Sequence, residues 1–252
     1  MGLIRSICSA ICSSICSGIS NICSSIGSSG FGHVLGSAVS KFTSTLNVIM
    51  PQVNIVKVII AVANVVVAIA EALGIKKKEK DEPEELAMKA EKDDKKPEDY
   101  ESTEAYIKHL QEEIELSKED KEKLNNMTEE EKAAYRATGT YIYLKGINEK
   151  LGLDDKGMKK PELSGINAEL VADLAKAMEK EIIIPSDFVT YCKHILNRGM
   201  SVDDFKQYLH GGISDVSKIK NIQGALSDAM KEINPNLDSD TIENKICNMC
   251  ID

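Results

Sequence analysis

The sequence contains no tryptophan, and aromatic residues make up only 4% of its 252 residues. A hydrophobic core must therefore be built mainly from Ile, Leu, Val and Ala. The chain also lacks GxSxG, GxGxxG, HExxH and a phosphate-binding loop, which are the usual signatures of serine hydrolases, dinucleotide-binding enzymes, zinc peptidases and nucleotide triphosphatases. We therefore expect a protein that is not an enzyme, with no catalytic residue, no metal and no cofactor.

Charge is scarce in the first part of the chain. Between Arg5 and Glu71 the only formally charged side chains are those of Lys41 and Lys57. The sequence then becomes densely charged, and the whole chain has a net charge of −9. This balance lacks the basic footprint of a nucleic-acid-binding protein. The sharp change in composition predicts three parts. They are an apolar helical segment over 1–75, a charged flexible linker over 76–103, and a soluble all-α domain over 104–252.

Residues 6–26 repeat Ile, Cys and Ser without any charged side chain. At about 100° per residue the Ile side chains fall in one helical stripe roughly 120° wide, with Cys on one flank and Ser on the opposite face. The stripe consists of Ile4, Ile7, Ile11, Ile15, Ile19, Ile22 and Ile26. Because Ser and Ile are poor helix formers, the helix needs a partner surface: a bilayer, another copy of itself or the rest of the protein. An uncharged Ser face favours close helix–helix contact in lipid.

The first residues, MGLIRS, match the pattern M-G-x-x-x-[ST] for N-myristoylation at Gly2. One acyl chain binds membranes only marginally, so a second anchor is usual. Four nearby cysteines are candidates for palmitoylation: Cys8, Cys12, Cys16 and Cys23. The alternative is that Gly2 is simply a small second residue and that the cysteines are small hydrophobic residues.

The most apolar run covers residues 53–74. Its uncharged part, 58–70, is shorter than the ~20 residues of a membrane-spanning helix, and it reaches that length only when Lys57 and Glu71 are included. The polar residues Lys57, Asn64 and Glu71 are seven apart and form one line. Because such a line is unfavourable against lipid, it predicts contact with a partner helix, a pore or a protein interior, and self-association in a fixed register. The alternatives are a buried helix of a soluble domain and a monotopic or hairpin arrangement with an amphipathic helix over 33–50.

Four lysines follow this run directly. They are Lys76, Lys77, Lys78 and Lys80. Such a cluster is typical of a helix end held at an anionic, cytoplasmic-type membrane face.

The remainder of the chain predicts about six or seven helices. The first is expected over 103–124, and Thr128 before three glutamates forms a capping box. Ser201 and Asp204 form another, and Gly199 suits a helix C-cap. The only strand-like stretch is 181–185. Weak candidates for chemistry are interpreted as a packed helix residue (Cys192), an exposed tail (Cys247–Cys250) and a helix start (the Asn- and Asp-rich run 234–245).

The sequence as a whole therefore predicts a non-enzymatic, membrane-attached, self-associating structural or interaction protein. The N-terminal third anchors it, and the helical domain faces a cytoplasmic-type compartment and binds a protein partner. The expected partners are a membrane, copies of the same chain and another protein, with no nucleic acid. One alternative is a pore-forming or membrane-permeabilising effector whose N-terminal helices oligomerise in a bilayer. Another is a subunit of a soluble assembly packed through residues 1–74.

Overall fold

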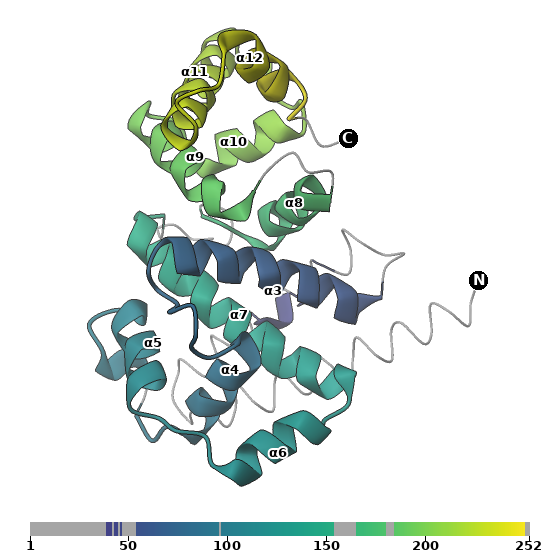
Figure 1. The fold of residues 1–252 in the computed structure, drawn as a ribbon, viewed down its shortest axis with the longest axis vertical. Coiled ribbons are helices and arrows are strands. Elements are labelled where there is room, and N and C mark those ends of the chain that lie inside the picture. Colours follow the sequence, from purple (N-terminus) through teal and green to yellow (C-terminus); the bar gives the residue numbers. More distant parts are fainter. Residues whose placement is uncertain are drawn as a thin grey trace, which may run out of the picture. The chain divides into compact units, whose positions relative to one another are not determined.

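The computed structural model describes residues 39–41, 43–44, 46, 54–95, 97–153, 165–179 and 184–249. All regular structure in these residues is helical, so the protein is all-α, as predicted. The chain divides into two compact units, residues 1–151 (unit 1) and 152–252 (unit 2). From residue 54 onward, the described helices of unit 1 are α3 (Ile55–Ala72), α4 (Pro83–Lys92), the short 3-10 helix η1 (Pro97–Asp99), α5 (Thr103–Glu112), α6 (Lys118–Asn126) and α7 (Glu129–Leu151) (Figure 1). Those of unit 2 are α8 (Ala168–Glu179), α9 (Pro185–Asn197), α10 (Val202–Leu209), α11 (Val216–Ile233) and α12 (Ser239–Cys247).

Helix α3 has well-defined ends that follow from its flanking residues. At its start, the side chain of Asn54 accepts a hydrogen bond from the backbone N–H of Val56 at 2.8 Å, which satisfies one of the free donors of the first turn. At its end, Gly74 has φ +71°, and the N–H of Ile75 bonds the carbonyl of Ala70 at 2.8 Å. This is a Schellman motif, in which glycine adopts the left-handed conformation without strain.

The core of unit 1 forms where α3 and α4 pack on the long helix α7. Ten apolar side chains of α3 are buried, and they include Val58, Val62 and Ile69. Each fully buried Val or Ile contributes about 1.5–3 kcal/mol relative to exposure. Among the described helices, α3 is also the one long and apolar enough to cross a membrane. The described fold thus uses α3 as a core helix, which was the alternative interpretation of the apolar run. Within the predicted helix over 33–50, the six described residues are helical.

Glycines in α7 allow close approach of its neighbours. A Cβ atom added to Gly139 would lie 1.7 Å from the backbone carbonyl oxygen of Pro83, at the start of α4. At Gly146 the nearest atom would be the side-chain Cδ1 of Ile107, at 2.9 Å. The first contact involves backbone on both sides, so α4 lies at its observed distance from α7 only because residue 139 has no side chain.

The prediction of a flexible linker over 76–103 is wrong. Residues 83–92 form α4, and Leu86, Ala87, Met88 and Ala90 are buried. The charged composition concealed this helix because its charged residues are paired rather than solvated. For the same reason a separate domain does not begin at 104, since α5, α6 and α7 belong to unit 1 together with α3 and α4.

Polar pairs connect α4 to its surroundings in unit 1. Arg136 of α7 donates two hydrogen bonds to Glu84, from Nε at 3.2 Å and Nη2 at 2.8 Å. Tyr135 donates to Glu91 at 2.7 Å. The ammonium group of Lys89 lies 2.7 Å from Asp81, and both side chains are nearly inaccessible to solvent. Two parallel bonds from one guanidinium fix orientation as well as distance.

The predicted helix over 103–124 is two helices in the structure. The first of them, α5, ends at Glu112. The second, α6, starts after Ser117, whose hydroxyl accepts a hydrogen bond from the N–H of Asp120 at 3.1 Å. The carboxylate of Asp120 in turn accepts a hydrogen bond from the N–H of Ser117 at 2.8 Å, which completes a capping box. Because of this break, the described residues between 103 and 247 form eight helices, where six or seven were expected.

The five described helices of unit 2 pack around an apolar core. Phe188 of α9 and Phe205 of α10 stack with ring centroids 5.9 Å apart. Tyr208 donates a hydrogen bond from α10 to the carbonyl of Ile246 in α12 at 3.3 Å. The predicted boundaries at Ser201 and Gly199 are confirmed: Ser201 caps α10, and Gly199 has φ +74° after α9. The run 234–245 is a helix start, with Asp238 capping α12.

Candidate interaction surface

The polar line predicted from the sequence lies on the outside of α3. Lys57 and Asn64 are exposed and Glu71 is partly buried, whereas the opposite side of the helix packs into unit 1. The protein interior is therefore excluded as the environment of Lys57 and Asn64 in this fold. A partner helix or a pore remains the prediction for this line.

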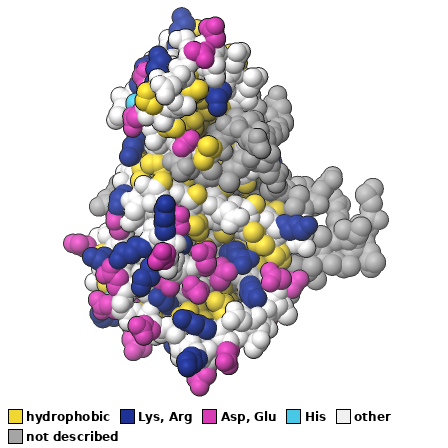
Figure 2. All heavy atoms as spheres, in the orientation of Figure 1, with side chains coloured by type: hydrophobic (Ala, Val, Ile, Leu, Met, Phe, Trp, Pro, Cys, Tyr) yellow, Lys and Arg dark blue, Asp and Glu magenta, His cyan; other side chains and the backbone are white. Residues whose placement is uncertain are grey.

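Apolar residues of intermediate burial accompany the polar line. The whole set, here called the α3 face, comprises Lys57, Ile60, Ala61, Asn64, Val67, Ala68 and Glu71. Spacings of three and four place all seven on one side of a helix. Figure 2 shows hydrophobic and uncharged side chains along α3, above a region of unit 1 crowded with charged ones. A narrow surface of this composition suits contact with another helix.

The lysine cluster after α3 is mostly engaged within the chain. The Lys76 side chain is 1% exposed, and its ammonium lies 3.0 Å from Glu71 and 3.5 Å from Glu82. Two other contacts involve neighbouring lysines: Lys77 pairs with Glu112 at 2.5 Å, and Lys80 donates to the carbonyl of Gln111 at 3.4 Å. The prediction that all four lysines face a membrane is therefore wrong for Lys76, because its charge is needed inside the protein. Lys78 is exposed.

A second polar cluster in unit 1 was not predicted from the sequence. It joins Asp93, Tyr100, Tyr106 and His109, from the end of α4, the segment after η1, and α5. Nε2 of His109 lies 3.2 Å from Oδ2 of Asp93, and Nδ1 lies 3.3 Å from Glu113. Within the described part of the chain, Asp93 Oδ2, His109 Nε2 and both tyrosine hydroxyls are buried without a hydrogen-bond partner. The i, i+3 spacing of Tyr106 and His109 was the only available signal, and many helices share it.

The electrostatics of this cluster limit its chemistry. Burial raises the pKa of both Tyr100 and Tyr106, and the nearby carboxylate of Asp93 raises it further. Both phenols therefore stay protonated at neutral pH and cannot act as phenolate bases or nucleophiles. The side chains of Asp93 and His109 are only 4% and 7% exposed. The cluster is thus a largely buried polar junction between helices.

Other candidates for chemistry fit structural roles. Complete burial raises the pKa of Cys192 well above its ordinary value, and a buried protonated thiol is unreactive. A hollow of about 430 Å³ in unit 1 is lined largely by charged side chains such as Lys80, Asp81 and Lys89, and so it differs from the apolar pockets that bind small molecules. Among the described residues, no three His, Cys, Asp or Glu side chains are grouped as metal ligands.

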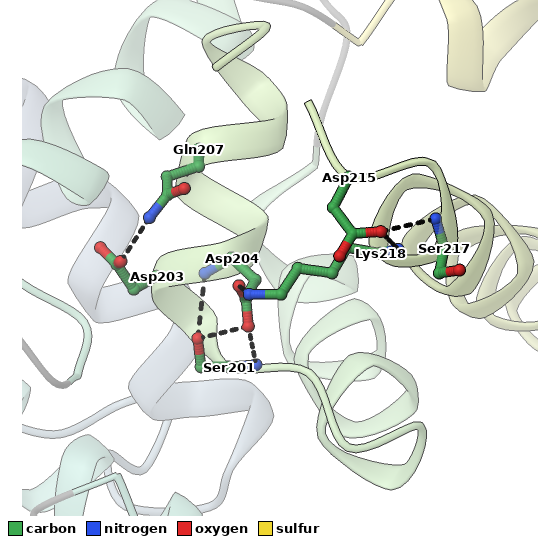
Figure 3. Close-up of polar contacts among 7 residues, drawn as sticks. All are labelled: Ser201, Asp203, Asp204, Gln207, Asp215, Ser217 and Lys218. Atoms are coloured by element: carbon green, nitrogen blue, oxygen red, sulfur yellow. Dashed lines mark hydrogen bonds and ion pairs between the residues drawn. The ribbon is translucent and has the colours of Figure 1, made fainter. Parts of the chain in front are cut away.

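An acidic cluster in unit 2 consists of helix caps (Figure 3). Asp204 accepts from the N–H of Ser201 at 2.9 Å and from Lys218 of α11 at 2.6 Å. Asp215 accepts from the N–H groups of Ser217 and Lys218 at the start of α11. These carboxylates are occupied by the ends of α10 and α11. The arrangement therefore stabilises the helices and leaves no open ligand site.

The predicted acylation sites and the Ile stripe lie outside the described residues. This applies to Gly2, to the first four cysteines, and to the stripe from Ile4 to Ile26. Comparison of the chain with protein-family models, with curated proteins and with solved structures finds no match.

Proposed function

We propose that this protein is a non-enzymatic, membrane-attached and self-associating interaction protein. The observation that carries the proposal is the Ile stripe of residues 4–26 beside an uncharged Ser face. A segment of poor helix formers with no charge gains its stability from an apolar partner surface. The myristoylation pattern at Gly2 and the apolar helix α3 are consistent with the same location.

The burial of α3 shifts the proposed attachment towards the Ile stripe of residues 4–26. Ten apolar side chains of α3 already pack inside unit 1, so inserting α3 into a bilayer would remove them from that core. None of these ten core side chains belongs to the stripe. The side of the membrane is not part of the proposal, because Lys76, Lys77 and Lys80 are bound within the chain.

Flotation of the full-length protein with liposomes tests this attachment. Changing Ile11, Ile15 and Ile19 together to Lys places three charges on the apolar stripe, so we expect flotation to be lost. The matched control changes Ser13, Ser17 and Ser20 to Lys, which adds the same charge to the opposite face and should preserve flotation. If the Ile variant floats as well as the unmodified chain, the proposed attachment is wrong.

A second candidate function is membrane permeabilisation. It is favoured by α3, whose 18 residues have a mean hydropathy of 2.3 and whose exposed side carries Lys57 and Asn64. In an oligomeric channel this polar line would face water. The same liposomes loaded with a self-quenched dye distinguish the two functions, since an anchor floats without leakage and a pore releases the dye.

The third candidate is a subunit of a soluble assembly packed through residues 1–74. In that case the Ile stripe would contact other copies rather than lipid. The full-length protein would then form defined oligomers in detergent-free buffer and would remain unbound to liposomes. The Ser-to-Lys control is informative here too, because closely packed copies would not tolerate it.

A further inference from the structure

We propose that a second copy of this chain docks on the α3 face, with the two α3 helices antiparallel and a twofold axis passing beside Asn64. The inference deepens the proposed self-association and rests on that part of the proposed function. It does not depend on membrane attachment, because the α3 face lies on the outside of unit 1 in the described fold.

The sequence of the α3 face is self-complementary about Asn64. In a pair of antiparallel helices related by a twofold axis, the residue n positions before the axis faces the residue n positions after it in the partner. Seven positions away, Lys57 therefore faces Glu71. Four positions away Ile60 faces Ala68, and three positions away Ala61 faces Val67. Each side chain of the α3 face thus has a counterpart on the same face.

The apolar pairs match large side chains with small ones. Ile60 would meet Ala68, and Val67 would meet Ala61. This alternation allows two helix surfaces to interlock at the axial separation of about 8–10 Å found in packed helices. Two large residues in opposition would hold the helices apart, and two small ones would leave a gap.

The charges determine the direction of the helices. In the part of the chain that the structure describes, no ion pair is recorded for Lys57, and its side chain is exposed. Glu71 is held in place because Oε1 accepts from the buried Lys76 at 3.0 Å, and a carboxylate has a second oxygen for Lys57 of the other copy. A parallel pair would oppose lysine with lysine and glutamate with glutamate, which is unfavourable.

The size of the contact limits its strength in solution. The distance along α3 from Lys57 to Glu71 is about 21 Å at 1.5 Å per residue. A single helix pair of this length buries less than the roughly 1,600 Å² of a standard stable interface. We therefore expect a weak, reversible dimer in water. Attachment to a surface would raise the effective concentration of the copies and favour it.

Zero-length carbodiimide cross-linking of the full-length protein tests the direction of the helices. The reagent joins an amine to a carboxylate only when they touch, and about 21 Å along one helix separates Lys57 from Glu71 of the same chain. A cross-link between them must therefore join two chains. Mixing unlabelled and ¹⁵N-labelled protein confirms this by mass spectrometry. We expect a mixed-label Lys57–Glu71 product, and its absence from cross-linked dimers would overturn the proposal.

Charge substitutions at Asn64 test whether the twofold axis passes beside this residue. Asn64 is exposed, so Asn64→Asp and Asn64→Lys should leave the fold intact, which circular dichroism checks. Each alone places like charges together at the axis, and we expect dimerisation measured by analytical ultracentrifugation to weaken roughly tenfold or more. An equal mixture of the two variants should recover association, because opposite charges then meet. The same pair of substitutions at Asn125, exposed on α6, is the matched control and should have no effect.

The outcomes separate this inference from the proposed attachment. Equal association of the unmodified chain and both Asn64 variants would overturn docking on the α3 face, even if the protein floats with liposomes. Loss of association without recovery in the mixture would also overturn it, because position 64 would then not meet itself. Recovery in the mixture by a protein that does not float would support the α3 dimer and contradict membrane attachment.

Discussion

The two units stabilise their helices in different ways. Nine polar or charged side chains are buried in the described residues, and all except Asp173 are in unit 1. Unit 1 holds α4 against α7 with paired charges and a glycine at the point of contact. Among the described residues of unit 2, Asp173 is the one buried charged or polar side chain, and side-chain caps begin α10, α11 and α12. Unit 1 should therefore be sensitive to the loss of a pairing partner or of close packing, and unit 2 to the loss of a cap.

The largest expected effect comes from adding one methyl group to unit 1. In Gly139→Ala the new Cβ would lie 1.7 Å from the carbonyl oxygen of Pro83, and backbone atoms cannot yield as a side chain does. We expect unit 1 to lose about 3 kcal/mol or more of its free energy of unfolding. Hydrogen exchange followed by mass spectrometry in increasing urea measures each unit within the full chain.

The matched control for this change is Gly146→Ala in the same helix. Its nearest neighbour is the end of the Ile107 side chain at 2.9 Å, which can rotate away. We expect a clearly smaller loss. Equal losses for the two variants would show that helix α4 does not depend on close contact at residue 139.

A smaller effect is expected from removing one partner of a partly buried ion pair. Glu84→Gln leaves Arg136 without its carboxylate, and both side chains are less than one-fifth exposed. Because an unpaired charge in such a site is costly, we expect unit 1 to lose about 2 kcal/mol. Denaturation of Glu122→Gln, an exposed position on α6, should match that of the unmodified chain. If both variants behave alike, unit 1 does not depend on this pair.

In unit 2 the corresponding test removes a cap. Ser201→Ala deletes the hydroxyl that accepts from the N–H of Asp204 at 3.0 Å. We expect a loss of about 1 kcal/mol in unit 2 and no change in unit 1. Urea or thermal denaturation followed by hydrogen exchange and mass spectrometry measures the stability of each unit separately. Ser214→Ala, in the exposed loop before α11, serves as the control, and a similar loss there would argue against a specific cap.

The smallest effect concerns acid stability. Hydrogen bonds from Lys92 and Ser117 lower the pKa of Asp120 to about 2. Since this folded-state pKa lies below the ordinary value of 3.8, the carboxylate stabilises unit 1 above about pH 4, and this stabilisation is lost as the pH falls towards 2. Asp120→Asn should therefore flatten the acid decline of unit 1 in this range, measured by denaturation at each pH.

Asp204 provides the counterpart in unit 2. Burial acts to raise its pKa, but hydrogen bonds from Lys218 and Ser201 outweigh burial and lower it. Asp204 therefore also stabilises when ionised and loses this effect as the pH falls through its lowered pKa. Asp204→Asn should flatten the acid decline of unit 2 and leave that of unit 1 unchanged. If either substitution alters both units equally, the two units do not respond to acid independently.

Local signals in the sequence predicted much of the fold. Caps such as Ser201 and Thr128 depend on residues three positions apart, so they can be read without tertiary information, and the structure contains both. The all-α class followed from the helical spacing of apolar residues along the chain. Whether the polar line on α3 faces solvent or the protein core could not be predicted, because an exposed stripe and a buried stripe have the same spacing.

The misassigned linker shows what local composition omits. Lys89 and Glu84 suggested a solvated segment, but their partners Asp81 and Arg136 neutralise them in the fold. Arg136 is 52 residues from Glu84 along the chain, and no local pattern indicates that they meet. The junction of Asp93, Tyr100 and His109 was missed for the same reason, since three different segments contribute to it.

The position of α4 also decides where this protein can be divided. A fragment beginning at residue 104 would retain α7 but lose α3 and α4, so the apolar surfaces of α7 that these two helices cover would meet water. Trypsin and glutamyl endopeptidase should likewise cut slowly within 83–92 despite its many Lys and Glu residues, because a helix must unwind to enter a protease. The charged region 76–103 is thus unsuitable as a boundary for a recombinant fragment.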